Sequence, residues 1–156
     1  MNKAIGFIGL GVMGSPMAGH LSNHHEIRVF NRSLEKTKSW IKKYSGSECS
    51  SVKEISKVSD ILFLCVGNDN DVREIISNKD GALKHLKSGS CIVDHTTTSA
   101  DLAKEMNNLL STKNINYLDA PVSGGQAGAE SGQLSIMVGG KNELYEELKD
   151  ILMTYS

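Results

Sequence analysis

The sequence predicts an α/β fold in which a doubly wound, mostly parallel sheet is covered by helices on both faces. Short apolar runs alternate with amphipathic helical stretches along the 156 residues, and such alternation is typical of right-handed βαβ crossovers. The first apolar run also leads directly into a glycine pattern, Gly9-x-Gly11-x-x-Gly14, where a helical pattern begins. Strand, glycine turn and helix in this order indicate a Rossmann-type dinucleotide-binding domain. We expect residues 1–156 to form that one domain.

The first expected strand, at residues 4–8, is long enough for a buried strand and too short for a helix. Gly9 permits a tight turn, Gly11 lets a pyrophosphate approach the backbone, and Gly14 lets the following helix pack closely against the strand. The helix N-terminus offers free N–H groups to the phosphates. A glycine-rich turn without a ligand is the alternative, which the strand–turn–helix context disfavours. The expected cofactor contacts here are Gly9, Leu10, Gly11, Val12, Met13 and Gly14.

The second strand is expected at residues 26–30, and the residues that follow it select the cofactor. In domains of this type, an acidic residue about 20 positions beyond the glycines bonds the ribose 2′-hydroxyl of NAD. This chain has Asn31, Arg32 and Ser33 there. An amide and a guanidinium accept a 2′-phosphate that a carboxylate would repel, and Lys36 could add positive charge. NADP is therefore the expected cofactor and NAD the less favoured one. A solvated Arg32 is the alternative interpretation.

The later elements continue the alternation. Strands are expected at residues 60–66, 90–94, 114–119 and 133–138, and helices at residues 35–43, 52–58, 71–77, 100–110 and 141–153. The strand at 60–66 is the clearest, because a continuous apolar run is typical of a parallel strand buried on both faces. Ser33 and Ser99 are expected to cap helices. Residues 47–51 are expected to form a turn, and residues 120–132 a glycine-rich loop.

Residues 9–21 resemble the N-terminal signature of the β-hydroxyacid dehydrogenases. This family includes 3-hydroxyisobutyrate dehydrogenase, tartronate semialdehyde reductase and, more distantly, 6-phosphogluconate dehydrogenase. The pattern Gly-Leu-Gly-x-Met-Gly-x-x-Met-Ala-x-His-Leu fits without a gap. The resemblance covers the chain from Lys3 to the last expected helix. It implies an oxidoreductase that transfers a hydride between NADP(H) and a small β-hydroxy acid or semialdehyde. In this family, an Asn-Arg pair such as that at 31–32 usually accompanies NADP.

The resemblance also assigns residues in later loops to the cofactor site. Val66, Gly67 and Asp71 match the cofactor-contact loop, although the family commonly has proline where this chain has Gly67. Asp71 is equally well explained as a carboxylate at a helix N-terminus. Thr97 would lie near the nicotinamide end of the cofactor. His95 is a candidate for a titrating role, but a polar surface position is the favoured interpretation of a lone histidine in a loop.

A second ungapped motif, at residues 119–134, is the expected substrate site. Two glycines after a serine expose backbone N–H groups beside a hydroxyl, which is an arrangement that can hold a carboxylate. As a bare pattern, this stretch could equally be a flexible turn. By resemblance, Ser123, Gly124 and Gly125 bind the carboxylate end of a small-molecule hydroxy acid.

No residue of this chain is expected to be catalytic. In the family, a lysine on a later long helix acts as general acid or base on the substrate oxygen, and Lys141 and Lys149 lie before that position. We expect negligible turnover by this chain alone. The alternatives are a stand-alone, non-catalytic NADP-binding module and half of an enzyme that a second chain completes.

The composition excludes several classes of partner. Seventeen basic and eighteen acidic residues give a net charge of −1, which does not favour nucleic acid or a membrane surface. Cys49, Cys65 and Cys91 have no metal-site spacing and are expected to be reduced thiols of a cytoplasmic protein, the last two in the core. The strand edge at residues 134–138 is expected to be unpaired, and the chain is therefore expected to form a homo-oligomer.

Overall fold

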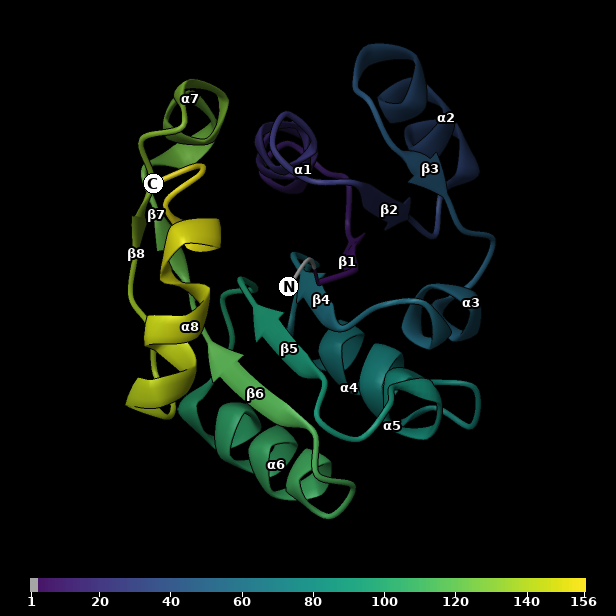
Figure 1. Cartoon of the computed structure of the whole chain (residues 1–156), viewed down its shortest axis with the longest axis vertical. Coiled ribbons are helices and arrows are strands. Elements are labelled where there is room, and N and C mark those ends of the chain that lie inside the picture. Colours follow the sequence, from purple (N-terminus) through teal and green to yellow (C-terminus); the bar gives the residue numbers. More distant parts are fainter. Residues whose placement is uncertain (1–2) are drawn as a thin grey trace.

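Six parallel strands form the central sheet, in the order β3-β2-β1-β4-β5-β6 (Figure 1). The computed structural model describes residues 3–156. The strands are β1 (Ile5–Ile8), β2 (Ile27–Phe30), β3 (Ser47–Glu48), β4 (Ile61–Leu64), β5 (Cys91–Asp94) and β6 (Asn116–Asp119). The strand order reverses between β1 and β4, and ligands of such sheets bind outside the carboxyl ends of the strands at this switch point. The predicted Rossmann-type fold is confirmed.

Helices cover both faces of the sheet (Figure 1). They are α1 (Gly14–Ser22), α2 (Leu34–Lys43), α3 (Val52–Lys57), α4 (Asp69–Ser77), α5 (Ala82–His85), α6 (Ala100–Ser111), α7 (Gly125–Ser131) and α8 (Asn142–Leu152). Strand side chains alternate between two buried clusters. Phe7 and Phe63 lie with residues of α1, α2, α7 and α8, whereas Leu62 and Leu64 lie with residues of α3, α4, α5 and α6. The apolar runs are therefore buried on both sides, as a parallel sheet requires.

Before residue 120, two short elements were not predicted. β3 occupies part of the expected turn at 47–51, where Ser47 and Glu48 pair with Arg28 and Val29 of β2. Its two exposed polar residues carry no strand pattern, so only the neighbouring strand reveals it. α5 is a single turn. The start of α4 also lies two residues earlier than expected, because the Asn68 side chain accepts a hydrogen bond from a backbone N–H of the first turn.

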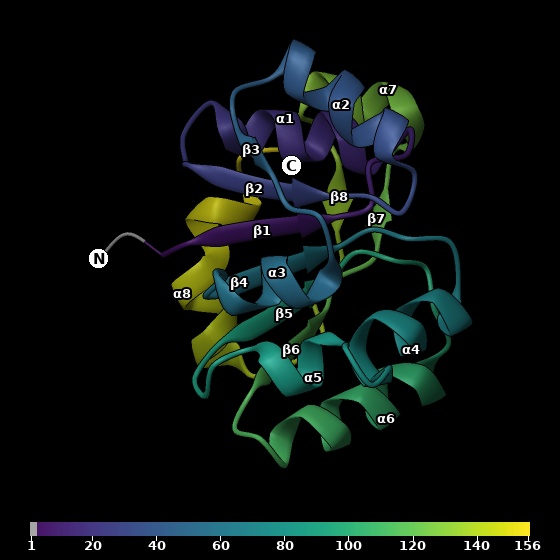
Figure 2. The same ribbon diagram turned by 90° about the vertical axis from the view of Figure 1, so that its right-hand side faces the viewer.

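The stretch from residue 120 to 138 differs most from the prediction. β7 (Val122–Ser123) and β8 (Ser135–Ile136) form a separate antiparallel hairpin, and α7 lies between them where a loop was expected. Gly132 ends α7 in the left-handed conformation, with φ of 70°, which glycine adopts without strain. Figure 2 shows this hairpin beyond the carboxyl ends of the sheet strands. The expected strand at 133–138 is therefore only two residues long and does not extend the main sheet.

The prediction of an unpaired edge at residues 134–138 is wrong. Leu134 N donates to Tyr155 O (3.1 Å) and Met137 N donates to Pro121 O (3.0 Å), in addition to the pairing of β8 with β7. Tyr155 itself is fully buried, so the end of the last helix folds back over this segment. Self-association stays a prediction, but this edge no longer supports it.

The three cysteines are free thiols. Cys91 is buried as expected, whereas Cys65 is only half-buried and Cys49, for which no core position was predicted, is also buried. Burial raises the pKa of the Cys65 and Cys91 thiols to about 12. Within residues 3–156, no helix combines the length and apolar character that a membrane span requires.

Candidate functional site

The turn between β1 and α1 depends on two glycines that have no room for a side chain. Gly9 has a φ of 104°, and a Cβ atom there would lie 2.0 Å from Cys65 O. A Cβ atom on Gly14 would lie 1.9 Å from Gly9 O. Gly11 is different, because a Cβ atom there would have no neighbour within 4 Å. The turn therefore packs tightly against other protein atoms at Gly9 and Gly14, whereas the space beside Gly11 is open.

The open part of this turn carries backbone donors without acceptors. Gly9 N is bonded to Phe30 O (3.1 Å) and Leu10 N to Asn31 Oδ1 (2.9 Å). The next four N–H groups have no hydrogen-bond acceptor within residues 3–156, namely those of Gly11, Val12, Met13 and Gly14. They precede or begin α1, whose N-terminus carries a partial positive charge. This arrangement fits a phosphate or pyrophosphate group.

A cavity of about 900 Å³ lies beside the turn. Most of the predicted cofactor residues line it: Gly9, Gly11, Val12, Met13, Gly14, Asn31, Arg32, Ser33, Val66, Gly67 and Asp71. Leu10 and Thr97 do not. The Leu10 side chain is buried in the core and its N–H group is already bonded, whereas Thr97 lies exposed on the loop after β5.

Further lining residues come from α3, α4 and the segment after α4, which the sequence reading did not include. They are Ser51, Val52, Lys53, Glu74, Ile75, Asn78, Asp80 and Gly81. Two signals could have indicated them. Asp71, Ile75 and Asn78 are spaced as one helical face. Ser51 follows the carboxyl end of β3, the strand that was missed.

Charges of opposite sign enter the cavity from different elements. Arg32 comes from the loop after β2, Lys36 from α2 and Lys53 from α3, and all three are exposed. The carboxylates come from α4 and the segment after it. Asn31 is only partly available to a ligand, because its Oδ1 accepts from Leu10 N and its Nδ2 donates to Ser33 O (3.1 Å). The residues after β2 that line the cavity therefore include two cations and no carboxylate.

The loop after β4 is held by two hydrogen bonds. Val66 N donates to Thr96 Oγ1 (3.0 Å) on the loop after β5. Gly67 N donates to Asp71 Oδ2 (3.2 Å). Asp71 thus closes its own loop and also lines the cavity, so both of its proposed roles remain compatible with its position.

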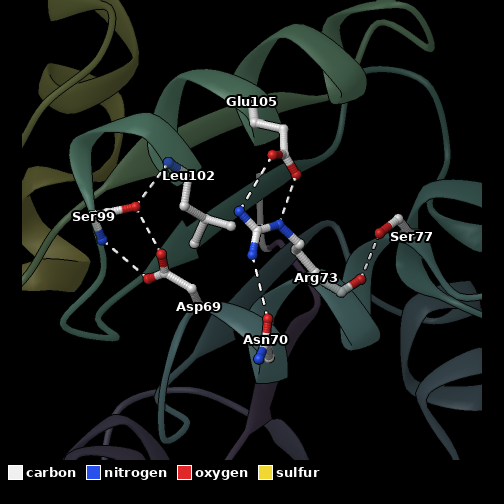
Figure 3. A network of polar contacts seen from close by, with 7 residues as sticks. All are labelled: Asp69, Asn70, Arg73, Ser77, Ser99, Leu102 and Glu105. Carbon is white, nitrogen blue, oxygen red and sulfur yellow. Dashed lines mark hydrogen bonds and ion pairs between the residues drawn. The ribbon is translucent and has the colours of Figure 1, made fainter.

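Two sets of polar contacts join α4 to α6 and to Ser99, which caps it (Figure 3). The Asp69 carboxylate accepts hydrogen bonds from Ser99 N (3.0 Å) and Ser99 Oγ (2.7 Å), and these bonds lower the pKa of Asp69. Arg73 pairs with Glu105 through Nε (3.0 Å) and Nη2 (3.3 Å). These contacts hold α4, which lines the cavity, against α6, the helix that follows Thr97.

Asp94 ends β5 with a buried carboxyl group. Its Oδ1 accepts from Thr96 N (2.9 Å) and its Oδ2 from the Tyr117 hydroxyl (2.8 Å). Burial raises the pKa of this carboxyl to about 6, because removal from water disfavours the charge more than the hydrogen bonds favour it. The loop that leads to Thr97 is therefore anchored by a group that titrates near neutral pH.

The interpretation of His95 as a polar surface residue is wrong. Its side chain is buried, with Nδ1 2.6 Å from Ala120 O and Nε2 2.5 Å from the Tyr155 hydroxyl. A carbonyl only accepts, so Nδ1 carries the proton and Nε2 accepts from Tyr155. Burial lowers the pKa of His95 to about 4. His95 does not line the cavity.

The predicted substrate residues lie outside the cavity. Ser123, Gly124 and Gly125 are exposed at the junction of β7 and α7. Both glycines have positive φ, 137° and 62°. The structure thus separates a glycine turn with a cavity from an exposed serine–glycine turn on the hairpin.

The open glycine turn, its free N–H groups and the cavity at the switch point define a dinucleotide-binding domain of the Rossmann type. Residues 4–156 match the model of the family described as the NAD binding domain of 6-phosphogluconate dehydrogenase, and the chain belongs to that family.

Relatives from the wider dehydrogenase group match along most of this chain. A protein of Shewanella frigidimarina (strain NCIMB 400) named "uncharacterized oxidoreductase" is 44% identical over 153 residues, which are 97% of this chain and 53% of that protein. The Arabidopsis thaliana protein named "probable 3-hydroxyisobutyrate dehydrogenase-like 2, mitochondrial" is 41% identical over 96% of this chain and 50% of its own length. The resemblance inferred from residues 9–21 is confirmed. The chain spans about half the length of these curated relatives.

Solved structures of related proteins have the same fold as this chain. Mycobacterium tuberculosis 3-hydroxyisobutyrate dehydrogenase, solved with L-serine, is 27% identical with a TM-score of 0.92 over 100% of this chain and 53% of that chain. Psf3, solved in complex with NADP+ and 2-OPP, is 29% identical with a TM-score of 0.91 over 97% of this chain and 54% of that chain.

Exchanging single glycines separates binding from folding. Gly11→Ala places a methyl group in open space beside the free N–H groups, so it should weaken NADPH binding by about tenfold or more while leaving thermal stability unchanged. Gly14→Ala forces a contact with Gly9 O and should lower the unfolding temperature strongly. Titration calorimetry and thermal unfolding measure the two effects. Equal loss of stability in both variants would contradict the open position of Gly11.

Replacing Asp94 by asparagine tests the raised pKa. The folded pKa of about 6 lies above the ordinary value of 3.8 for an aspartate, so the ionised group lowers stability above pH 6, and this penalty disappears as the pH falls from 6 towards 3.8. The stability of Asp94→Asn relative to the unmodified chain should therefore drop by about 2–3 kcal/mol between pH 7.5 and pH 4. Urea unfolding at both pH values measures it. A difference that does not change with pH would contradict the buried charge.

Proposed function

We propose that this chain is the NADP(H)-binding part of an oxidoreductase that transfers a hydride between NADP(H) and a small β-hydroxy acid or semialdehyde. One observation carries the cofactor part of the proposal: four backbone N–H groups that have no acceptor within residues 3–156 stand at the N-terminus of α1, beside Gly11, where a Cβ atom would have no neighbour within 4 Å. These donors fit the pyrophosphate of a dinucleotide. The bound nicotinamide would supply the hydride chemistry.

The preference for NADP is supported by charge. The residues after β2 that line the cavity, Asn31, Arg32, Ser33 and Lys36, include no carboxylate that would bond a ribose 2′-hydroxyl or repel a 2′-phosphate. Arg32 lines the cavity and is free to make charge-assisted hydrogen bonds, and Lys36 and Lys53 line the same cavity. Asn31 holds the glycine turn through Leu10 N, so we assign the 2′-phosphate to the cations and give Asn31 a supporting role. The NADP+ in the Psf3 structure favours the same cofactor.

The substrate class is supported by the motif and by the names of relatives. Ser123, Gly124 and Gly125 match the motif that binds the carboxylate end of the substrate in the resembled family, and they lie exposed on the hairpin beyond the sheet. Relatives are named for 3-hydroxyisobutyrate and 2-hydroxy-3-oxopropionate, which are both small oxygenated carboxylic acids. We therefore propose that these three residues hold a carboxylate of the substrate.

Removing the Arg32 side chain tests the cofactor preference. The unmodified chain should bind NADPH several-fold more tightly than NADH, and Arg32→Ala should lower NADPH affinity by about tenfold or more, because charge-assisted hydrogen bonds to the 2′-phosphate are lost. NADH affinity should stay within about twofold. Lys38→Ala, an exposed α2 residue outside the cavity, is the matched control. Titration calorimetry with both dinucleotides measures the effect, and equal affinities in the unmodified chain would refute the NADP preference.

A further inference from the structure

We propose that His20 and the His95–Tyr155 pair are positioning residues that hold residues 120–134, the segment with Ser123 and both glycines of its turn, on the dinucleotide-binding body. The inference rests on the proposed function for the role of that segment, but its contacts do not. The segment does not extend the six-stranded sheet, and in addition to backbone hydrogen bonds such as that from Ala120 N to Asp94 O, polar side chains of other elements hold it in place. The structure provides three such side chains.

His20 holds the carboxyl end of α7. Its Nε2 lies 2.9 Å from Ala129 O and 3.1 Å from Glu130 O. Both partners are carbonyl oxygens, so Nε2 carries a proton and donates to the two of them. These are carbonyls of the last turn of α7, where the helix dipole is negative. Ala129 O also accepts from Gly132 N (3.3 Å). His20 belongs to α1, the helix whose other end carries the free N–H groups.

Gly132, which ends α7, lies beside the His20 imidazole. A Cβ atom on Gly132 would lie 3.4 Å from Cε1 and 3.5 Å from Nε2 of His20. Such distances are ordinary van der Waals contact, so glycine is required here by its left-handed φ of 70° and not by the imidazole. One helix, α1, therefore contacts the proposed pyrophosphate site at its N-terminus and the proposed substrate segment near its C-terminus.

Tyr155 holds the two ends of the same segment. Its backbone oxygen accepts from Leu134 N (3.1 Å). Its hydroxyl donates to His95 Nε2, and His95 Nδ1 donates to Ala120 O. Ala120 N in turn donates to Asp94 O (2.8 Å). The segment is therefore closed at residues 120 and 134 by one buried tyrosine, while His20 fixes the helix between them.

This arrangement sets the distance between the two proposed sites. His95 precedes Thr96, whose hydroxyl accepts from Val66 N in the cofactor loop. The same short loop thus contacts the cavity wall through Thr96 and the start of the substrate segment through His95. A shift of that segment would move Ser123 relative to the nicotinamide end, and misplacement on the order of 1 Å is costly in bound complexes.

The test uses this chain with NADPH and 3-hydroxyisobutyrate as probes. His20→Ala removes the donor, whereas His20→Gln keeps an amide nitrogen near the place of Nε2. Tyr155→Phe keeps the ring and removes the hydroxyl. Amide hydrogen exchange is read at Gly128 and Gln133, whose N–H groups are bonded within the segment, and at the strands β1, β4 and β5. Calorimetry gives the affinities for NADPH and, with NADPH bound, for 3-hydroxyisobutyrate.

We expect His20→Ala and Tyr155→Phe to accelerate exchange in the segment by about tenfold or more, with little change in the strands. In both variants, affinity for 3-hydroxyisobutyrate should fall at least about fivefold, whereas affinity for NADPH should stay within about twofold. His20→Gln should restore the affinity for 3-hydroxyisobutyrate. Exchange that rises equally everywhere, or does not rise in the segment, would overturn the proposal. If the unmodified chain binds NADPH but not 3-hydroxyisobutyrate, the proposed substrate fails, and the exchange data still decide on the positioning residues.

Discussion

The close approach of the β1–α1 turn to itself and to β4 is the constraint on which the rest of this structure depends. Gly14 can begin α1 only because it has no Cβ atom to meet Gly9 O, and Gly9 can turn only because it has none to meet Cys65 O. These approaches leave four N–H groups without an acceptor among residues 3–156 and direct the helix N-terminus towards the cavity. The cost of unpaired donors is tolerable at a surface that water or an anion reaches.

The loops at the carboxyl edge are joined to one another by polar side chains. Asn31 Oδ1 accepts from the glycine turn, Thr96 Oγ1 accepts from Val66 N, and His95 donates to Ala120 O. Each of these residues follows the end of one strand and bonds to the loop of a neighbouring element. The edge that carries the proposed site is therefore cross-linked by hydrogen bonds, although the strands themselves are only a few residues long. Burial makes such bonds hard to exchange for water.

Much of the fold and part of the site followed from local pattern. The long strands and most helices were predictable because their apolar periodicity is strong, and the predicted capping role of Ser99 is local. The Asn68 cap is equally local but was not predicted. Ser33 also precedes a helix, but its side chain makes no capping bond. The cavity residues of α3 and α4 were missed because their position depends on how α3 packs against β2 and α5 and how α4 packs against α5 and α6. His95 was misread because loop position says nothing about what covers a side chain.

The sequence by itself determined the Rossmann fold, the glycine turn and the family, because these rest on short-range periodicity and on residues that tolerate no side chain. Only the tertiary structure decided how residues 120–134 are arranged. The placement of α7 depends on His20, which is more than a hundred residues from Ala129 in the sequence. The start of the segment depends on His95, which is sixty residues from its partner Tyr155. Such contacts leave no periodic signal, since each is a single hydrogen bond made after the sheet has brought distant segments together. For that reason Tyr155, which carries no motif, proved to be the residue that closes the segment.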